Sequence, residues 1–359
     1  MSTVPSARAA RRKVAVLGAT GAVGQAFIRR LAAHPWFELT ELAASERSAG
    51  KPYAEAARWI GNDSIPASVQ HRPVVACDPA VVDADIVFSA LDASVAGEVE
   101  AAFARAGKIV LSNARNYRME DDVPLVIPEV NPEHLGLIAR QRERRGWPGA
   151  IVTNANCSTI GLTLALAPLH ERFRIERVFV ATMQAVSGAG YPGVPSLDIL
   201  GNVVPFIGGE EEKIEAEALK MLGRFDGTSV GAAPIAITAH ANRVPVEHGH
   251  TICVSVGFAE RVTPEAVREA LEDWGGSEEA RGLPTAPPRP LELATEPDRP
   301  QPRRDVDRGN GMAVTIGRIR RDPMLDVKFV ALAHNIVRGA AGASVLNAEL
   351  MERAGMLPE

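Results

Sequence analysis

The sequence predicts an α/β protein with two domains: an N-terminal Rossmann-type domain with a doubly wound parallel sheet, then an α+β domain with a mixed or antiparallel sheet. Two observations predict this fold class. Strand-like and helix-like segments alternate in the first third of the chain, which is typical of a parallel sheet. After Cys157, long strand-like stretches follow one another without helices between them, which favours an antiparallel or mixed sheet. The 359 residues also exceed the usual size of a single hydrophobic core.

The first domain opens with "KVAVLGATGAVGQAFIRRLAAHP", where an apolar strand, a glycine-rich turn and a helix follow one another. The apolar residues of that helix recur at helical spacing; they are Val23, Phe27, Ile28 and Leu31. Further strand-like runs cover residues 37–45, 84–92 and 108–114, and the helical pattern "ASVAGEVEAAFARAG" lies between the last two. We expect this domain to span residues 1–157 and to be completed by a C-terminal helix within residues 335–359.

The second domain is expected to span residues 158–334. Its strand-like stretches are "IERVFVATMQAVSG", "GAAPIAITAHANRVPVEHGHTICVSVGFA" and "MAVTIGRIRRDPMLDVKFVALAHN". Residues 275–311 are rich in proline and charge, which excludes a continuous helix or a central strand and predicts an ordered surface connection. The C-terminal helix is expected to carry its large apolar residues on one side; these are Val345, Leu346, Leu350 and Met351.

Composition and charge narrow the classes of function. A net charge of −5 provides no basic field for nucleic acid, and no apolar run reaches the roughly 18 residues of a membrane span. Cys77, Cys157 and Cys253 lie far apart without a CxxC pair, which suits neither a disulfide framework nor a zinc site. We therefore expect a cytoplasmic protein with no metal and no nucleic-acid or membrane partner. The basic start, "MSTVPSARAARRK", lacks the apolar core of a signal peptide and is interpreted as a short disordered tail.

The turn "GATGAVG" is a candidate phosphate site, because it follows a strand and opens a helix. Gly18 permits the tight turn, Gly21 lets backbone approach a phosphate, and Gly24 lets the helix pack on the strand. The helix N-terminus would then offer free N–H groups to a pyrophosphate. A mononucleotide site and a tight turn without any ligand are the alternatives.

The end of the second strand indicates which dinucleotide binds. NAD sites usually place an acidic residue there to bind the ribose 2′-hydroxyl, whereas NADP sites have residues there that accommodate the 2′-phosphate. The segment "SERSAGK" offers Ser45, Arg47 and Ser48 to a 2′-phosphate, which favours NADP. Glu46 argues the other way, and an exposed, solvated loop is the alternative interpretation.

Cys157 is a candidate nucleophile. In "NANCSTIGLTL" it stands just before a long apolar helix, and a helix N-terminus or a nearby histidine lowers the pKa of a thiol. Ser158 and Thr159 are candidate caps of that helix. The alternative is a small buried structural thiol, which is how we interpret Cys77 and Cys253.

The segment "NRVPVEHGHT" crowds Arg243, His248 and His250 near the end of a strand. Arg243 and His250 have opposite parity, so a regular strand would send their side chains to opposite faces. Both can serve one site only if the chain bulges or turns around Gly249.

Taken together, these segments resemble the aspartate-semialdehyde dehydrogenase family, particularly its archaeal and fungal-type branch, from Lys13 to the C-terminus. In family order, the resemblance is carried by "GATGAVG", "SERSAGK", "FSALDASVA", "SNARNYR", "NANCSTIG", "MQAVSGAGYPG", "GGEEEKIEAE", "NRVPVEHGHT" and "RGAAGA". It implies an NADP-dependent enzyme of lysine, threonine and methionine biosynthesis that interconverts L-4-aspartyl phosphate and L-aspartate 4-semialdehyde, with phosphate. It also implies a homodimer or homotetramer formed through the second domain.

The resemblance further implies roles for individual residues. Cys157 would be the nucleophile that forms a thioester, Gln184 would orient the acyl intermediate, and His250 would be the general acid/base. Arg118 and Lys213 would clamp the acyl phosphate. The residues implied for the cofactor are Gly18, Thr20, Gly21, Ala22, Val23, Gly24, Ser45, Arg47, Ser48, Ser89, Ala90, Leu91, Ser187, Gly188 and Asn335.

The resemblance also implies contacts to the substrate, and it leaves one of them open between two glutamates. Arg243 would bind the α-carboxylate, a task that suits a planar guanidinium, and Asn156 would lie beside the phosphate. Glu211 would meet the α-amino group, although the repeated glutamates leave Glu210 open for this role. Otherwise Glu210 and Glu212 are interpreted as a solvated acidic helix face.

Four other interpretations compete with this resemblance. A malonyl-CoA reductase of the same branch would use the same cysteine and cofactor, but Glu211 favours a substrate with an amino group. N-acetylglutamyl phosphate reductase and glyceraldehyde-3-phosphate dehydrogenase carry thiol motifs that "NANCSTI" does not match. A non-catalytic NADP-binding module is disfavoured, because Cys157, Gln184, Arg243 and His250 are all present.

Overall fold

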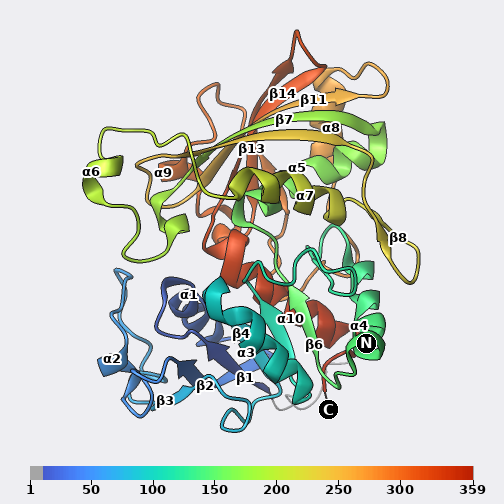
Figure 1. Ribbon diagram of the computed structural model, residues 1–359. Coiled ribbons are helices and arrows are strands. Elements are labelled where there is room, and N and C mark those ends of the chain that lie inside the picture. The colour runs from blue at the N-terminus through green and yellow to red at the C-terminus, as the bar shows by residue number, and fades with distance from the viewer. Residues whose placement is uncertain (1–10, 359) are drawn as a thin grey trace, which may run out of the picture.

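The computed structural model describes residues 11–358, so most of the basic start, residues 1–10, lies outside the described part of the chain. The chain forms two six-stranded sheets, each with its own helices, arranged one above the other in Figure 1. Within residues 11–358, no helix is long and apolar enough to cross a membrane.

The first sheet is entirely parallel and has the strand order β3-β2-β1-β4-β5-β6. This order confirms the predicted Rossmann-type, doubly wound sheet, in which ligands bind outside the carboxyl ends of the strands where the order reverses. Its strands are β1 (Arg12–Leu17), β2 (Phe37–Ala44), β3 (Val74–Ala76), β4 (Ile86–Ser89), β5 (Ile109–Ser112) and β6 (Ala150–Thr153). The helices of this region are α1 (Ala22–Leu31), α2 (Tyr53–Ala56), α3 (Ala93–Arg105), a 3-10 turn (Pro132–Gly136) and α4 (Leu137–Arg145).

The second sheet is mixed and has the order β10-β7-β11-β14-β13-β12, as the long strand-like stretches predict. Strand β11 runs antiparallel to both neighbours, whereas β10 pairs with β7 and β12 with β13 in parallel. The strands are β7 (Ile175–Gln184), β10 (Ala236–Arg243), β11 (His250–Phe258), β12 (Leu291–Leu293), β13 (Val314–Arg321) and β14 (Val327–Ala333), with a small hairpin of β8 (Arg224–Phe225) and β9 (Val230–Gly231). The accompanying helices are α5 (Cys157–Phe173), a 3-10 turn (Val186–Ala189), α6 (Ser196–Ile199), α7 (Glu210–Met221), α8 (Pro264–Asp273), α9 (Pro302–Asp305) and a 3-10 turn (Arg308–Gly311).

Helix α5 joins the two sheets and begins at Cys157. It packs against α7, α8 and the strands of the second sheet, and its apolar residues belong to the core beneath that sheet. Figure 1 shows α5 and α7 on the side of the second sheet that faces the first. The opposite face of the second sheet leaves large apolar side chains exposed, such as Phe179 at 42% and Met183 at 36%.

The C-terminal helix differs from the expected one-sided pattern. A π-helical turn (Val337–Ala341) leads into α10 (Gly342–Arg353), and every residue from Gly342 to Met351 is buried. Its apolar residues pack into the core of the first sheet, while the polar Asn347 and Glu349 are buried as well. The helix is therefore an interior element rather than an amphipathic cover.

Residues 275–311 form the expected ordered connection. They contain only the short edge strand β12, one turn of helix in α9 and a 3-10 turn. The buried carboxylate of Asp305 organises the segment, because it accepts hydrogen bonds from the Arg299 side chain and the Gln301 backbone N–H, each at 2.7 Å.

Candidate active site

The glycine-rich turn between β1 and α1 is shaped by close backbone contacts. Gly18 has a φ of 73°, and a Cβ there would lie 2.6 Å from the carbonyl oxygen of Ala90. A Cβ on Gly24 would collide with the carbonyl oxygen of Gly18. Gly21 is the N-cap of α1 and no side chain of the described chain caps that helix, so its first N–H groups remain free for an anion. The turn therefore fits the phosphates of a dinucleotide.

Two side chains that the sequence analysis did not single out hold this turn in place. The amide of Gln25, which is buried, donates to the carbonyl oxygens of Thr20 at 3.0 Å and Arg58 at 2.8 Å. The hydroxyl of Tyr53 donates to the carbonyl oxygen of Ala19 at 2.8 Å. The turn is thus tied both to α2, through Tyr53, and to the segment that follows this helix, through Arg58.

The remaining residues expected at the cofactor lie at the same edge of the first sheet. Ser45 and Arg47 are exposed and Ser48 is half-buried in the loop after β2. Ser89 ends β4 and is buried, and the next residue, Ala90, donates its N–H to the carbonyl oxygen of Leu17 at 2.9 Å. These positions lie at the carboxyl ends of β2 and β4, on either side of β1, which leads into the glycine-rich turn.

A second group of predicted cofactor residues comes from the other sheet. The Asn335 amide donates to the Ser187 hydroxyl at 2.8 Å and accepts the Gly249 backbone N–H at 2.9 Å. His248, which was grouped with Arg243 and His250, places Nδ1 2.9 Å from the same hydroxyl. The predicted residues Ser187 and Asn335 are therefore in direct contact.

Cys157 occupies the first turn of α5, as the sequence suggests, but the cap is a different residue. The N-cap is Asn156, whose Oδ1 accepts the backbone N–H groups of Ser158 at 2.9 Å and Thr159 at 3.1 Å. Ser158 and Thr159, the expected caps, are thus the residues whose backbone N–H groups are capped. The Cys157 sulfur lies 3.1 Å from Nε2 of His250.

The contacts of His250 define which nitrogen carries its proton. The backbone N–H of Ala185 donates to Nδ1 at 3.0 Å, so a neutral ring must carry its proton on Nε2, which faces the Cys157 sulfur. Burial is the main cause that lowers the pKa of His250 to about 3, and the charge of Arg243 acts in the same direction. The ring is therefore a neutral hydrogen-bond donor toward the sulfur.

The thiol pKa moves in the direction opposite to the one expected at a helix N-terminus. Burial raises the pKa of Cys157 to about 12, and the negative charge of Glu210 also raises it, whereas Arg118 and Arg243 oppose the shift. Desolvation by the surrounding protein is the largest of these effects. The resting pair consists of a neutral thiol and a neutral imidazole.

Arg243 and His250 do meet at one site, because the chain turns between them. Arg243 ends β10 beside Gln184 of β7, and His250 begins β11 on the other side of β7. Gly249 has a φ of 98° within this turn. A Cβ on Gly188 would lie 2.9 Å from Arg243 Nη1 and 3.1 Å from His250 Cε1, so both side chains line the same small space.

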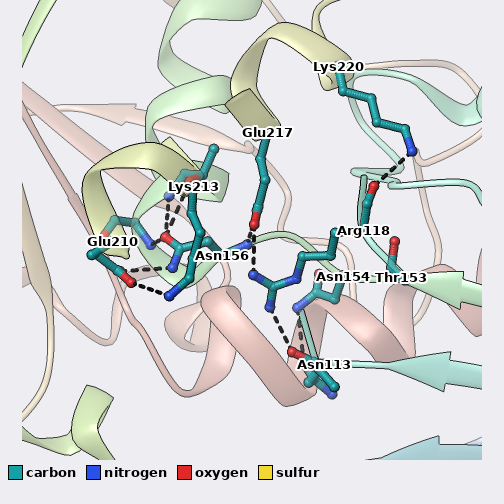
Figure 2. Close-up of polar contacts among 12 residues, drawn as sticks. Asn113, Arg118, Thr153, Asn154, Asn156, Glu210, Lys213, Glu217 and Lys220 are labelled. Carbon is teal, nitrogen blue, oxygen red and sulfur yellow. Dashed lines mark hydrogen bonds and ion pairs between the residues drawn. The ribbon is translucent and has the colours of Figure 1, made fainter. Parts of the chain in front are cut away.

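Helix α7 places a carboxylate beside Asn156 and Lys213. This carboxylate belongs to Glu210 and not to Glu211, the residue expected to meet the substrate amino group. Glu210 is only 5% exposed and accepts hydrogen bonds from the Asn156 amide at 2.8 Å and Lys213 Nζ at 3.1 Å (Figure 2). The prediction that Glu210 lies on a solvated helix face is therefore wrong. Glu211 instead accepts the Ala241 backbone N–H at 2.9 Å, because the helix turns that side toward β10. Glu212 is exposed, as expected.

Two further residues of α7 were missed by the sequence analysis. Glu217 accepts the Arg118 guanidinium at 2.9 Å and the Asn156 backbone N–H at 2.6 Å. Lys220 donates to the carbonyl oxygens of residues 118, 120 and 123, at 2.8, 2.7 and 2.9 Å. Figure 2 shows that Glu210, Lys213, Glu217 and Lys220 lie along one side of α7. Polar residues spaced three and four apart lie on one face of a helix, so this pattern in the sequence could have indicated that all four face the site.

Matches to protein families accord with this geometry. Residues 13–138 match the model of the semialdehyde dehydrogenase NAD binding domain, and residues 166–338 match that of the semialdehyde dehydrogenase dimerisation domain. An aspartate-semialdehyde dehydrogenase from Archaeoglobus fulgidus is 56% identical over 341 residues, covering 95% of this chain and 98% of that protein. The chain belongs to the aspartate-semialdehyde dehydrogenase family.

Other members of the family are similar over the same length. The aspartate-semialdehyde dehydrogenase of Schizosaccharomyces pombe is 49% identical over 354 residues, which cover 96% of this chain and 99% of that protein. The crystal structure of the Candida albicans enzyme with NADP superposes with a TM-score of 0.88 at 44% identity, covering 97% of this chain and all of that one. Membership makes the chain an oxidoreductase of amino-acid biosynthesis that acts on an aldehyde, uses a nicotinamide cofactor and carries a dimerisation domain.

Proposed function

We propose that this aspartate-semialdehyde dehydrogenase reduces L-4-aspartyl phosphate to L-aspartate 4-semialdehyde with release of phosphate, in the synthesis of lysine, threonine and methionine. One observation carries the proposal: the Cys157 sulfur lies 3.1 Å from His250, beside a carboxylate and three cationic side chains. The cations suit an anionic substrate with a phosphoryl and a carboxylate group. They are Arg118, Lys213 and Arg243.

The proposed cofactor is NADP. Free N–H groups at the start of α1 suit its pyrophosphate, and Ser45, Arg47 and Ser48 suit its 2′-phosphate. The Candida albicans relative was crystallised with NADP, which supports the same choice. When bound in its reduced form, the cofactor supplies the hydride for the second half of the reaction.

In the first half of the reaction, we propose that Cys157 attacks the acyl carbon of aspartyl phosphate. A sulfur–carbon bond forms, the carbon–oxygen bond to the phosphoryl group breaks, and a thioester remains on Cys157. Since His250 Nε2 already carries a proton, the thiol proton leaves with the phosphate, which departs as hydrogen phosphate. Arg118 and Lys213 stabilise the charge that gathers on the leaving group, and Asn156 lies beside it.

In the second half, negative charge develops on the thioester oxygen as its carbon is reduced. We assign His250 the task of donating a hydrogen bond from Nε2 to this oxyanion, and Gln184 that of orienting the acyl group. Collapse of the tetrahedral intermediate releases the aldehyde and the Cys157 thiolate, which then takes one proton from solvent. His250 stays neutral throughout. Its proposed role is therefore that of a hydrogen-bond donor to the oxyanion and not that of a general acid/base.

Substrate selection is assigned to Arg243 and Glu210. Arg243 donates to the carbonyl oxygen of Ala185 at 2.7 Å and lines the space beside Gly188, which suits a bidentate grip on the α-carboxylate. Glu210 replaces Glu211 as the proposed partner of the α-amino group, because only Glu210 is buried beside Asn156. A carboxylate at this point disfavours malonyl-CoA, whose malonyl group carries no amino group.

We also propose a homodimer or homotetramer in the cytoplasm. The exposed apolar residues on the open face of the second sheet, Phe179 and Met183, support association through that domain. The three cysteines are unpaired, which suits a reducing compartment. We place the boundary between the two domains at residues 157 and 158, with residues 335–359 returning to the first domain.

A spectrophotometric assay tests the proposed activity. Purified protein is mixed with aspartate semialdehyde, phosphate and NADP, and in parallel with malonyl-CoA and NADPH. We expect phosphate-dependent formation of NADPH in the first mixture and none with Cys157→Ala. Oxidation of NADPH by malonyl-CoA alone would overturn the substrate, and no reaction in either mixture would favour a non-catalytic NADP-binding protein.

A further inference from the structure

Glu217 of α7 is a buried carboxylate that the reaction described above does not use. It is 2% exposed and contacts both Arg118 of the proposed phosphate clamp and Asn156, the residue directly before the nucleophile. Each of its two oxygens serves a different part of the site. Oε1 accepts Arg118 Nη1 at 2.9 Å, and Oε2 accepts the backbone N–H of Asn156 at 2.6 Å (Figure 2).

The bond to Asn156 acts on the residue directly before the nucleophile. Asn156 is the N-cap of α5, and its side chain is already occupied by Glu210 and by the first turn of the helix. Its backbone N–H lies outside the helical hydrogen-bond pattern, so an acceptor from elsewhere must hold it. Glu217 is that acceptor, and it therefore fixes the peptide that leads into Cys157.

The bond to Arg118 aims a buried guanidinium. Arg118 is 8% exposed, with Nη1 on Glu217 and Nη2 donating to the carbonyl oxygen of Asn113 at 2.7 Å. Its Nε is buried and has no partner within residues 11–358. Lys220, one turn after Glu217, donates to the Arg118 carbonyl oxygen at 2.8 Å and holds the backbone of the same residue. Helix α7 thus grips Arg118 at both ends.

We propose that Glu217 is a positioning residue: one carboxylate sets the distance between the Arg118 guanidinium and the start of the nucleophile's helix. This inference rests on the proposed roles of Arg118 and Cys157. A phosphoryl group must meet Arg118 while its acyl carbon meets the sulfur, so an error of about 1 Å between them costs up to about 100-fold in rate. A shared anion fixes that distance and also offsets the buried charge of Arg118 when no phosphate is bound.

The test uses Glu217→Gln, which keeps the size of the side chain but can offer only one oxygen acceptor. A matched control is Glu215→Gln on the same helix, because Glu215 accepts the Ala239 backbone N–H at 3.0 Å on the side facing β10. The assay is phosphate-dependent NADPH formation from aspartate semialdehyde. KM for inorganic phosphate, KM for the aldehyde, NADP affinity and melting temperature are measured for each protein.

We expect Glu217→Gln to raise KM for phosphate at least tenfold and to lower kcat, with NADP affinity unchanged and Glu215→Gln like the wild type. In an Arg118→Ala background the same change should add less than twofold to KM for phosphate, because it acts through that guanidinium. An unchanged KM for phosphate, or a full effect without Arg118, would overturn the inference. If Glu217→Gln does not fold, Glu217→Asp is measured against the same criteria, and failure of both to fold would make Glu217 a purely structural residue. Wild-type protein without activity would instead contradict the proposed function.

Discussion

Adding one methyl group at Gly339 gives a sharp test of how Cys157 is held. Gly339 lies in the π-helical turn before α10, and a Cβ there would lie 2.6 Å from the Cβ and 2.9 Å from the Cα of Cys157. An ordinary Cβ contact begins near 3.4 Å, so the segments that contain Gly339 and Cys157 must separate by roughly 0.8 Å. Alanine is otherwise the better helix residue, so the clash is the dominant penalty.

The expected cost of Gly339→Ala has two parts. Overpacking of this kind costs about 1–3 kcal/mol of unfolding free energy. Displacing Cys157 by close to 1 Å would break its 3.1 Å contact with His250 and cost about 100-fold in kcat/KM. Activity should therefore fall much further than stability.

The measurement compares kcat/KM for aspartate semialdehyde with the free energy of unfolding in urea. Gly231→Ala is the control, because its new Cβ would meet no atom closer than 3.9 Å. Wild-type activity in Gly339→Ala would refute the packing of the π-helical turn on the nucleophile. A loss of activity that merely parallels a loss of folded protein would refute the displacement argument.

Three further outcomes follow from the same geometry. Cys157→Ser should leave NADP affinity nearly unchanged and abolish turnover; a loss of cofactor binding in a titration would contradict the role of the sulfur. Glu210→Gln should raise KM for aspartate semialdehyde at least tenfold and Glu211→Gln less than threefold in steady-state assays, and the reverse order would restore the original assignment of the amino-group contact. Because the raised pKa of Cys157 favours the thiol, its alkylation by iodoacetamide in the unliganded protein should be slow at pH 7 and should keep rising with pH toward that pKa of about 12. Peptide mapping assigns the label, and rapid alkylation of this residue that saturates below pH 8.5 would show a thiolate paired with a protonated His250.

The sequence was most informative where local chemistry decides the structure. The alternation of strands and helices, the glycines of residues 18–24 and the cysteine at a helix start all follow from short-range rules. The turn at Gly249 was required before both Arg243 and His250 could reach one site, and the structure contains it. Family resemblance added the reaction and the assignment of roles.

The remaining features depend on packing that no single segment encodes. Three consecutive glutamates are equivalent in sequence, and only the contact of α7 with α5 decides that Glu210 faces inward. The tautomer of His250 depends on a backbone N–H from Ala185, 65 residues earlier in the chain. The thiol pKa could not be predicted either, because the burial that raises it comes from elements far apart in the sequence.

The formation of a thioester on Cys157 is the central claim, and a single-turnover experiment tests it most directly. Protein is mixed with aspartate semialdehyde and NADP in the absence of phosphate, and NADPH is recorded by stopped flow. We predict a burst of about one NADPH per subunit, an acyl group on the peptide that contains Cys157, and continued turnover once phosphate is added. Steady NADPH formation without phosphate and without modification of this cysteine would contradict the account.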